Sequence, residues 1–187
     1  MISHDHQLIF VHYPRTGGSS IEFLFEQPMQ DTVPLSILVH RYGQETCDNY
    51  YKFTIVRNPF DWFVSSYFYF KDRPVAKGKL PIVRQDETFK EYIDNCYEKT
   101  LVQGLGMKQQ YDWHVSNGSL NVDQVIRFEE YETQVPMFLF DYGIEVPIPH
   151  INKTEDRLAY AEYYDLETKN KVMAMCEPDL DYFQYAF

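Results

Sequence analysis

Near its start the chain runs Leu8-Ile9-Phe10-Val11-His12-Tyr13-Pro14-Arg15-Thr16-Gly17-Gly18-Ser19-Ser20, an order that predicts a buried strand, a tight turn and the start of a helix. A glycine-containing turn followed by a helix N-terminus presents several backbone N–H groups, which can surround a phosphate together. A basic side chain and three hydroxyls add to these donors. The residues that we expect to contact such an anion are Arg15, Thr16, Gly17, Gly18, Ser19 and Ser20.

The same turn has a plainer interpretation, because a strand-to-helix connection can use glycines for its geometry alone. It is not a Walker A loop, since the spacing G-x-x-x-x-G-K-[ST] is absent and no lysine precedes Ser19 or Ser20. A nucleoside triphosphate site with bound magnesium is therefore not favoured. From this turn alone, an anion site and a purely structural turn both stay open.

The length of 187 residues predicts one domain, 1–187, in which residues 1–6 form a loose N-terminal tail. The formal net charge of −11 opposes a nucleic acid or a strongly anionic polymer as the main partner, because either would be repelled at long range. Three widely spaced cysteines suggest neither a disulfide framework nor a zinc site, which favours a reducing cytoplasm. No apolar run is long enough to predict a membrane anchor.

Strand, turn and helix alternate along the chain. The pattern predicts strands at 52–57 and 121–128, which are followed by helices at 60–70 and 129–140. Helical spacing is also present at 86–99 and 165–176. Surface loops are predicted at 71–81 and 147–155. This alternation is typical of an α/β fold with a central parallel sheet flanked by helices. Ligands bind at the carboxyl ends of such strands, so we expect the turns after Tyr13, Arg57 and Phe128 to converge.

A second motif begins where the strand at 52–57 ends. Arg57 is followed by Asn58-Pro59, and Ser65 lies eight residues after the arginine. If a helix begins near Pro59, Ser65 lies about two turns into it and can return beneath the end of the strand. A guanidinium and a hydroxyl then suit a second, terminal phosphate, although a structural link between strand and helix would use the same two residues.

Together the two segments resemble the 5′-phosphosulfate loop and the 3′-phosphate motif of sulfotransferases, the enzymes that use 3′-phosphoadenosine 5′-phosphosulfate (PAPS). Residues 14–20 are similar to their P-K-T-G-G-T-S loop, and residues 57–67 are similar to R-N-P-x-D-R-x-V-S-x-Y. Further segments that resemble the carbohydrate-type group of this family are 110–113, 122–129, 149–154, 163–165 and 179–185. The resemblance thus runs in order over nearly the whole chain.

The resemblance implies a P-loop-NTPase-like sulfotransferase fold and a defined chemistry. It implies transfer of the sulfuryl group of PAPS to a hydroxyl of a sugar or another small polar acceptor, with adenosine 3′,5′-bisphosphate as the product and no metal. The acidic charge of the chain counts against a heavily sulfated polymer as acceptor. Two alternatives remain, a P-loop-type nucleotide kinase and a non-catalytic protein that binds a nucleotide bisphosphate.

By the resemblance, Arg15 and the backbone of the loop hold the 5′-phosphosulfate, Arg57 and Ser65 hold the 3′-phosphate, and Lys153, next to Asn152, closes over the nucleotide. Two positions depart from the family pattern. Arg15 stands where the family has lysine, and it keeps the charge but cannot donate a proton at ordinary pH. Trp62 stands where the second motif has arginine, so the stabilisation of the leaving group is an open question.

The base that takes the proton of the acceptor is predicted to be a histidine, because its pKa lies near neutrality. His40 leads, since related carbohydrate sulfotransferases carry a histidine between the loop and the second strand; the alternative is an ordinary exposed loop histidine. The runners-up are His114 and His150, whereas His12 lies in the strand that enters the loop and is better explained as a satisfied strand residue. Tyr67 is expected either to contact the 3′-phosphate or to pack. Gln110 and Trp113 are candidates to border the adenine or the acceptor, and core packing is the stronger interpretation for Trp113.

Overall fold

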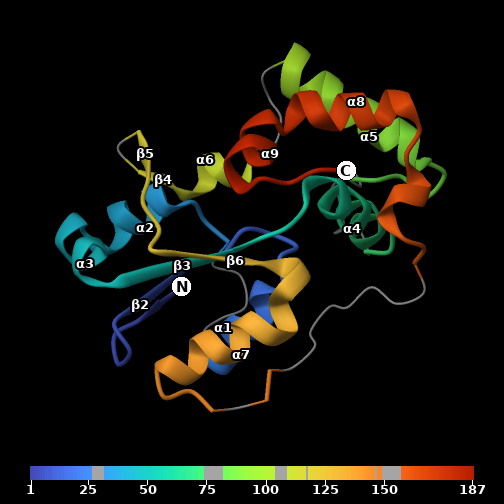
Figure 1. Ribbon diagram of the computed structural model, residues 1–187. Coiled ribbons are helices and arrows are strands. Elements are labelled where there is room, and N and C mark those ends of the chain that lie inside the picture. Colours follow the sequence, from blue (N-terminus) through green and yellow to red (C-terminus); the bar gives the residue numbers. More distant parts are fainter. Residues whose placement is uncertain (27–31, 74–81, 104–108, 117, 146, 149–156) are drawn as a thin grey trace. The chain divides into compact units, whose positions relative to one another are not determined.

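The computed structural model describes the chain except residues 27–31, 74–81, 104–108, 117, 146 and 149–156 (Figure 1). The described chain divides into two compact units. One comprises Met1–Arg57 and Gln110–Lys153 and contains the main sheet; we call it the sheet unit. The other comprises Asn58–Gln109 and Thr154–Phe187, and we call it the helical unit.

The sheet unit alternates strands and helices. In chain order its elements are β1 (Ile2–Ser3), β2 (Leu8–Val11), α1 (Gly18–Leu24), α2 (Leu35–Tyr42), α3 (Gln44–Asn49), β3 (Tyr51–Val56), α6 (Gln110–His114), β4 (Val115–Ser116), β5 (Ser119–Leu120), β6 (Gln124–Arg127), the 3₁₀-helix η2 (Phe128–Glu130) and α7 (Tyr131–Asp141). The main sheet has the order β1-β2-β3-β6, in which β2, β3 and β6 are parallel and β1 is antiparallel to β2. This architecture confirms the predicted α/β fold with a central, mostly parallel sheet.

Both faces of the sheet are covered, as the apolar run in β2 requires. Phe10 packs on one side with Ile21 of α1 and Leu139 of α7, whereas Ile9 packs on the other side with Leu38 of α2. Successive side chains of a strand point to opposite faces, so each face of β2 meets its own helices. Figure 1 shows α1 and α7 together on one side of these strands.

The three parallel strands end at the same edge. Val11 lies opposite Thr54, and Val56 lies opposite Arg127 in the next pair of strands. The segments that follow β2, β3 and β6 therefore leave the sheet close to one another, as the sequence predicts. Their side chains build the candidate site.

The N-terminal residues do not form the loose tail that the sequence predicts. β1 pairs with β2 through Ile2 opposite Ile9, and both Met1 and Ile2 are buried. His4 lies next to Tyr50, with 2.8 Å between its Nδ1 and the tyrosine hydroxyl oxygen. The prediction for residues 1–6 is therefore wrong, because two apolar residues gain burial by extending the sheet at its edge.

The helical unit consists of helices in its described part. They are α4 (Pro59–Lys71), α5 (Phe89–Tyr97), the π-helix η1 (Glu98–Val102), the 3₁₀-helix η3 (Tyr160–Tyr163), α8 (Leu166–Met175) and α9 (Glu177–Phe183). The helix predicted at 60–70 is confirmed as α4. The helix predicted at 86–99 corresponds to α5 and the start of η1, and the one predicted at 165–176 corresponds to α8. Of the two predicted loops, 74–81 and 149–155 lie outside the described residues.

α4 begins at a proline and is buried over its first nine residues. The side chain of Asn58 accepts a hydrogen bond from the N–H of Phe60 at 3.0 Å, and Pro59 occupies the first helical position. These are the preferred residues for a helix start, because the cap satisfies a free N–H and proline has none to satisfy. Every residue of 59–67 is buried, which explains the weak amphipathic pattern of this helix.

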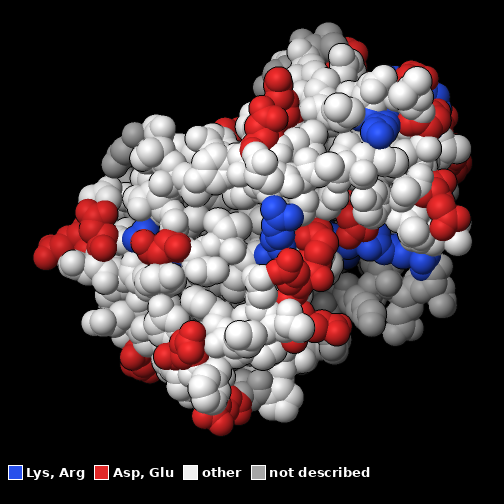
Figure 2. Space-filling view, viewed as in Figure 1, with Lys and Arg blue, Asp and Glu red and all other residues white. Residues whose placement is uncertain are grey.

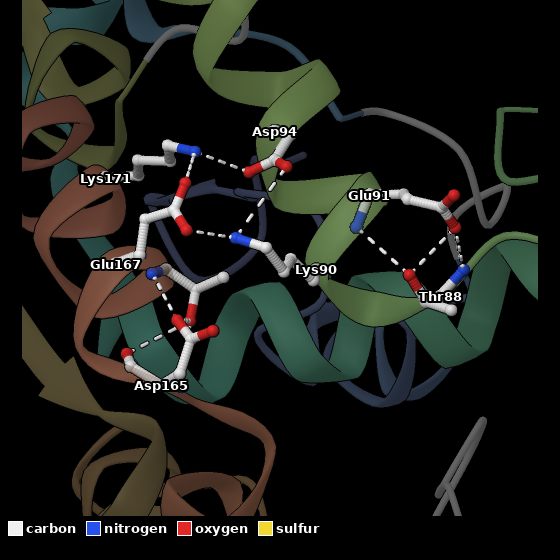
Figure 3. A network of polar contacts seen from close by, with 8 residues as sticks. Thr88, Lys90, Glu91, Asp94, Asp165, Glu167 and Lys171 are labelled. Carbon is white, nitrogen blue, oxygen red and sulfur yellow. Dashed lines mark hydrogen bonds and ion pairs between the residues drawn. The ribbon is translucent and has the colours of Figure 1, made fainter.

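α5 and α8 are linked by ion pairs on the surface of the helical unit (Figure 3). Lys171 donates to Asp94 at 2.7 Å and to Glu167 at 2.5 Å, and Lys90 also donates to Glu167. Hydrogen bonding to Asp94 and Glu167 raises the pKa of Lys171. Exposed ion pairs of this kind each contribute little to the free energy of unfolding.

Acidic side chains are spread over the face shown in Figure 2, and basic ones are fewer there. The distribution fits the formal net charge of −11. No helix in the described part of the chain has both the length and the apolar character needed to cross a membrane. Within the same residues, no group of three or more His, Cys, Asp and Glu side chains is placed to hold a metal ion.

Candidate functional site

The turn between β2 and α1 is held by its own polar groups. The hydroxyl of Thr16, which is fully buried, donates to the carbonyl oxygen of Tyr13 at 2.7 Å, and the N–H of Ser20 donates to the carbonyl oxygen of Gly17 at 3.2 Å. Arg15 has φ of 65°, a left-handed conformation that is costly for a residue with a Cβ atom. A strained residue in a satisfied turn is a common property of ligand-binding loops.

The two glycines of the turn are explained by neighbouring side chains. Gly17 has φ of 81°, and a Cβ atom there would lie 2.7 Å from the ring of Tyr131. A Cβ atom at Gly18 would lie 2.1 Å from the ring of His12. Any larger residue at either position would push the loop away from the residues beneath it, so the glycines allow close packing of the loop on the sheet unit.

Arg57 follows β3 and joins the loop. Its Nη1 donates to the carbonyl oxygen of Arg15 at 2.9 Å, and its guanidinium lies 4.1 Å from the centroid of the Phe128 ring. The residue is 5% exposed. The carboxyl ends of β2, β3 and β6 thus contribute one residue each to a single cluster, which confirms the convergence predicted for the three turns.

Gln110 fixes the main chain of Arg57 from the start of α6. Its Oε1 accepts from the N–H of Arg57 at 2.8 Å, and its Nε2 donates to the carbonyl oxygen of Arg57 at 2.8 Å. The amide therefore pairs with both backbone groups of Arg57, as a neighbouring strand would. This support of Arg57 is a role that the sequence analysis did not consider for Gln110.

Two aromatic residues that sequence reasoning missed complete the cluster. Phe128 lies under the guanidinium of Arg57, and the hydroxyl of Tyr131 donates to the carbonyl oxygen of Gly17 at 3.2 Å. Burial raises the pKa of Tyr131 to about 12, so its hydroxyl stays protonated and remains a donor. The signal available in the sequence was position alone, because Phe128 ends the third predicted strand and Tyr131 follows three residues later.

A buried acid–base pair lies beneath the loop. Nδ1 of His12 is 2.8 Å from Oε1 of Glu22, which projects from α1, and the two residues are 4% and 0% exposed. The imidazole also stacks on Phe10, with 5.4 Å between ring centroids. His12 is thus a buried residue at the end of β2, and Glu22 is a site residue that the sequence analysis did not identify.

His114, a runner-up for the base, is fully buried. Its Nε2 lies 2.7 Å from the hydroxyl oxygen of Thr54, which in turn lies 2.8 Å from the carbonyl oxygen of Val11. Burial lowers the pKa of His114 to about 3, so that the imidazole is neutral near pH 7. A base without access to solvent cannot reach an acceptor hydroxyl, and this position assigns His114 to the core.

His40 lies in the last turn of α2 and its side chain is exposed. It is therefore a helical residue rather than a loop residue. α2 begins after Pro34, buries Leu35 and Leu38, and ends at Gly43, whose φ of 86° stops the helix. The exposure leaves the imidazole accessible, and its role as the base stays a prediction.

The remaining predicted residues lie elsewhere. Ser65 is buried in α4 of the helical unit, so the sharing of one anion with Arg57 of the sheet unit stays a prediction. Tyr67 uses its hydroxyl to donate to the carbonyl oxygen of Glu87 at 2.7 Å, which gives it a packing role. Trp113 packs edge-on against Tyr13, and Trp62 is buried. Lys153, Asn152 and His150 lie outside the described residues.

The cluster fits the phosphate groups of a nucleotide. Gly17 is the N-cap of α1 and, having no side chain, makes no side-chain cap to the helix. The first N–H groups of an α-helix have no partner within the helix, and of those in α1 the N–H of Ser20 donates to Gly17. The others lie at the turn that Arg57 contacts through the carbonyl oxygen of Arg15. Guanidinium and amide donors are the usual partners of phosphate oxygens.

Comparison with known proteins identifies the family of this chain. The family model described as "Sulfotransferase family" matches residues 1–186. The chain belongs to the sulfotransferase family. This membership confirms the expectation of an enzyme that uses PAPS as its sulfate donor, and it removes the nucleotide kinase from consideration.

A solved structure has the same fold as this sulfotransferase. It is the crystal structure of mouse sulfotransferase SULT7A1 complexed with PAP, which superimposes with a TM-score of 0.56 at 14% identity. The alignment covers 96% of this chain and 85% of the mouse chain. A search of curated proteins finds no match.

Proposed function

We propose that this sulfotransferase transfers the sulfuryl group of PAPS to a hydroxyl of a sugar or another small polar acceptor, and releases adenosine 3′,5′-bisphosphate. The observation that carries the proposal is the position of Arg57. Its guanidinium is bound to the carbonyl oxygen of Arg15 and stacked on Phe128, so that a buried cation is fixed beside the amides of the loop. Two sets of anion donors at one place suit a nucleotide with two separate phosphate groups.

In the proposed complex, Arg15 and the amides of Thr16 to Ser20 hold the 5′-phosphosulfate, while Arg57 and Ser65 hold the 3′-phosphate. PAPS supplies the activated sulfuryl group. Because Arg15 cannot donate a proton at ordinary pH, its contribution is charge and hydrogen bonding at the phosphate that departs. Lys153 is proposed to close over the nucleotide.

His40 is the proposed base. An acceptor hydroxyl loses its proton as it attacks, and an exposed imidazole can take that proton near neutral pH. The exposure of His40 and its place in the sheet unit, which also contains the loop, support this role. His12 and His114 are less suitable, since both are buried.

The proposed acceptor class rests on sequence resemblance and on charge. A sugar is favoured by the resemblance of several segments to the carbohydrate-type group, and the acidic surface disfavours a polymer that is already sulfated. The cytoplasmic location predicted from the cysteine content stays a prediction.

The test is transfer of ³⁵S from labelled PAPS to a panel of acceptors, with sugars, phenols and simple alcohols assayed side by side in excess EDTA. The proposal expects labelled sugar to accumulate without added metal in the wild type. The Arg57→Ala variant should show a large loss, and Arg73→Ala, which changes an exposed arginine, should not.

Each outcome has a consequence for the proposal. Transfer to phenols alone would correct the acceptor class. Tight binding of adenosine 3′,5′-bisphosphate with no transfer to any acceptor would favour the non-catalytic alternative.

A further inference from the structure

The pair formed by His12 and Glu22 has no part in the proposed chemistry, yet it lies directly under the donor loop. Nδ1 of His12 is 2.8 Å from Oε1 of Glu22. Both residues are almost fully buried, and Oε2 of Glu22 has no hydrogen-bond partner among the described residues. A half-satisfied buried carboxylate is costly, so stability alone does not account for its presence.

The geometry orients the imidazole. An ionised carboxylate only accepts hydrogen bonds, so Glu22 holds His12 with its proton on Nδ1. The stacking on Phe10, at an angle of 17° between the rings, sets the plane of the imidazole. Two independent contacts thus fix the rotation of one side chain.

The opposite edge of the imidazole supports the loop. A Cβ atom built on Gly18 would lie 2.1 Å from Cδ2 of His12 and 2.3 Å from its Nε2. The backbone of Gly18 therefore rests against this edge, and Gly18 is the first residue of α1. Any rotation of the imidazole would displace the amides at the start of the helix.

We propose that His12, held by Glu22, is a positioning residue that fixes the backbone of Gly18 for binding of the donor's 5′-phosphate end. The pair acts through the loop and does not touch the nucleotide. This inference rests on the proposed donor site, because the loop must bind the 5′ end of the nucleotide for its position to matter. Displacement of donors by about 1 Å is enough to weaken an oriented site strongly.

Replacement of Glu22 tests the proposal, because this buried side chain contacts His12. Glu22→Leu fills a similar volume but removes the acceptor, whereas Glu22→Gln keeps an oxygen that can accept from Nδ1. The control is Glu45→Leu, which removes an exposed carboxylate from α3 and changes the net charge equally. Each variant is titrated with adenosine 3′,5′-bisphosphate in a calorimeter, well below its melting temperature.

The sign of the effect separates positioning from simple electrostatics. Loss of a negative charge near an anion site strengthens anion binding on Coulombic grounds alone. The proposal instead expects Glu22→Leu to raise the Kd about tenfold at unchanged binding stoichiometry, with Glu22→Gln within about threefold of the wild type. A variant that merely misfolds would lower the stoichiometry and leave the Kd of the remaining folded protein unchanged.

A measurement on the wild type keeps the test decisive if Glu22→Leu does not fold. In ¹⁵N-histidine-labelled protein, the buried Nδ1 proton of His12 is expected as a slowly exchanging, downfield resonance that moves when adenosine 3′,5′-bisphosphate saturates the site. The resonance of His114 serves as the internal reference, since that imidazole contacts Thr54 and is not the ring that packs against Gly18.

The results also distinguish this inference from the proposed function. If the wild type does not bind the bisphosphate, the donor site itself is wrong. If the wild type binds it, an unchanged or lower Kd in Glu22→Leu would overturn the positioning role. Where that variant does not fold, the positioning role would be overturned by a His12 resonance whose chemical shift does not change when the bisphosphate binds.

Discussion

Gly17 shows how a single residue position can be set by two separate requirements. It has φ of 81°, and a Cβ atom would also lie 2.7 Å from the ring of Tyr131. Gly143 has a similar φ of 73° but nothing within 4 Å of an added Cβ atom. The two glycines therefore share the backbone requirement and differ in the contact, which makes them a matched pair.

Gly17→Ala is expected to destabilise the protein more than Gly143→Ala and to weaken bisphosphate binding. The positive φ alone costs about 1 kcal/mol in each variant, and the contact with Tyr131 adds to it only at Gly17. Urea denaturation measures the stability of each variant, and calorimetry measures its affinity for adenosine 3′,5′-bisphosphate. Equal losses of stability in the two variants would show that the Tyr131 contact is not restrictive.

His40 is the residue on which the proposed chemistry depends most. His40→Ala is expected to reduce turnover about 100-fold or more while the affinity for adenosine 3′,5′-bisphosphate stays nearly unchanged, because a base acts in the transition state only. His4→Ala, which removes another exposed histidine of the sheet unit, is the control. Turnover of His40→Ala at the level of the control would move the base to another residue.

At the scale of elements, α6 is a short helix that holds the end of β3. Gln110 makes two hydrogen bonds of 2.8 Å to the backbone of Arg57, and it is 2% exposed. This contact connects the helix to the strand end that carries the guanidinium.

Gln110→Leu should lower the free energy of unfolding by about 2 kcal/mol or more, since it removes the partner of a buried N–H and a buried C=O group. Gln44→Leu, a change at an exposed residue of α3, should alter it by less than about 0.5 kcal/mol. Denaturant titration compares the two. A loss for Gln110→Leu no larger than that of the control would mean that Arg57 does not depend on this amide.

The elements that the sequence predicts well are those with strong local signals. β3 is marked by an apolar run, and α4 is marked by an Asn-Pro start. The observed bounds of both elements differ from the predicted ones by one residue at each end. β1 was missed because two residues gain their strand geometry only from pairing with β2. α2 was missed because it is short, with eight residues of which only Leu35 and Leu38 are buried.

The same distinction applies to the site. Residues 14–20 and Arg57 could be identified because their chemistry is local and their motifs are contiguous. Glu22, Phe128 and Tyr131 could not, since each becomes a site residue only through packing against the loop or against Arg57. No spacing rule predicts such contacts.

At the scale of the whole molecule, burial of His114 couples stability to pH. Its pKa is about 3 in the folded protein, against 6.5 for an ordinary histidine. The unfolded chain therefore binds a proton between these values and the folded chain does not. The contribution of the neutral, buried His114 to the free energy of unfolding is fully present above pH 6.5, and it is lost as the pH decreases toward 3.

Through His114, the free energy of unfolding is expected to fall by up to about 1.4 kcal/mol for each pH unit of acidification within this window. His114→Gln removes the titrating group, so its unfolding free energy should depend less on pH over the same range. Urea denaturation of both proteins at several pH values measures the difference. Parallel pH profiles would show that His114 titrates normally in the folded state.

The central claim is that the loop and Arg57 form one site for a nucleotide with phosphates at both the 5′ and 3′ positions. The most direct measurement is a calorimetric comparison of adenosine 3′,5′-bisphosphate with adenosine 5′-monophosphate on the wild type. A charge-assisted contact to the 3′-phosphate predicts that the bisphosphate binds about 30-fold more tightly, and that Arg57→Ala loses this preference. Equal affinity of the wild type for the two nucleotides would contradict the account.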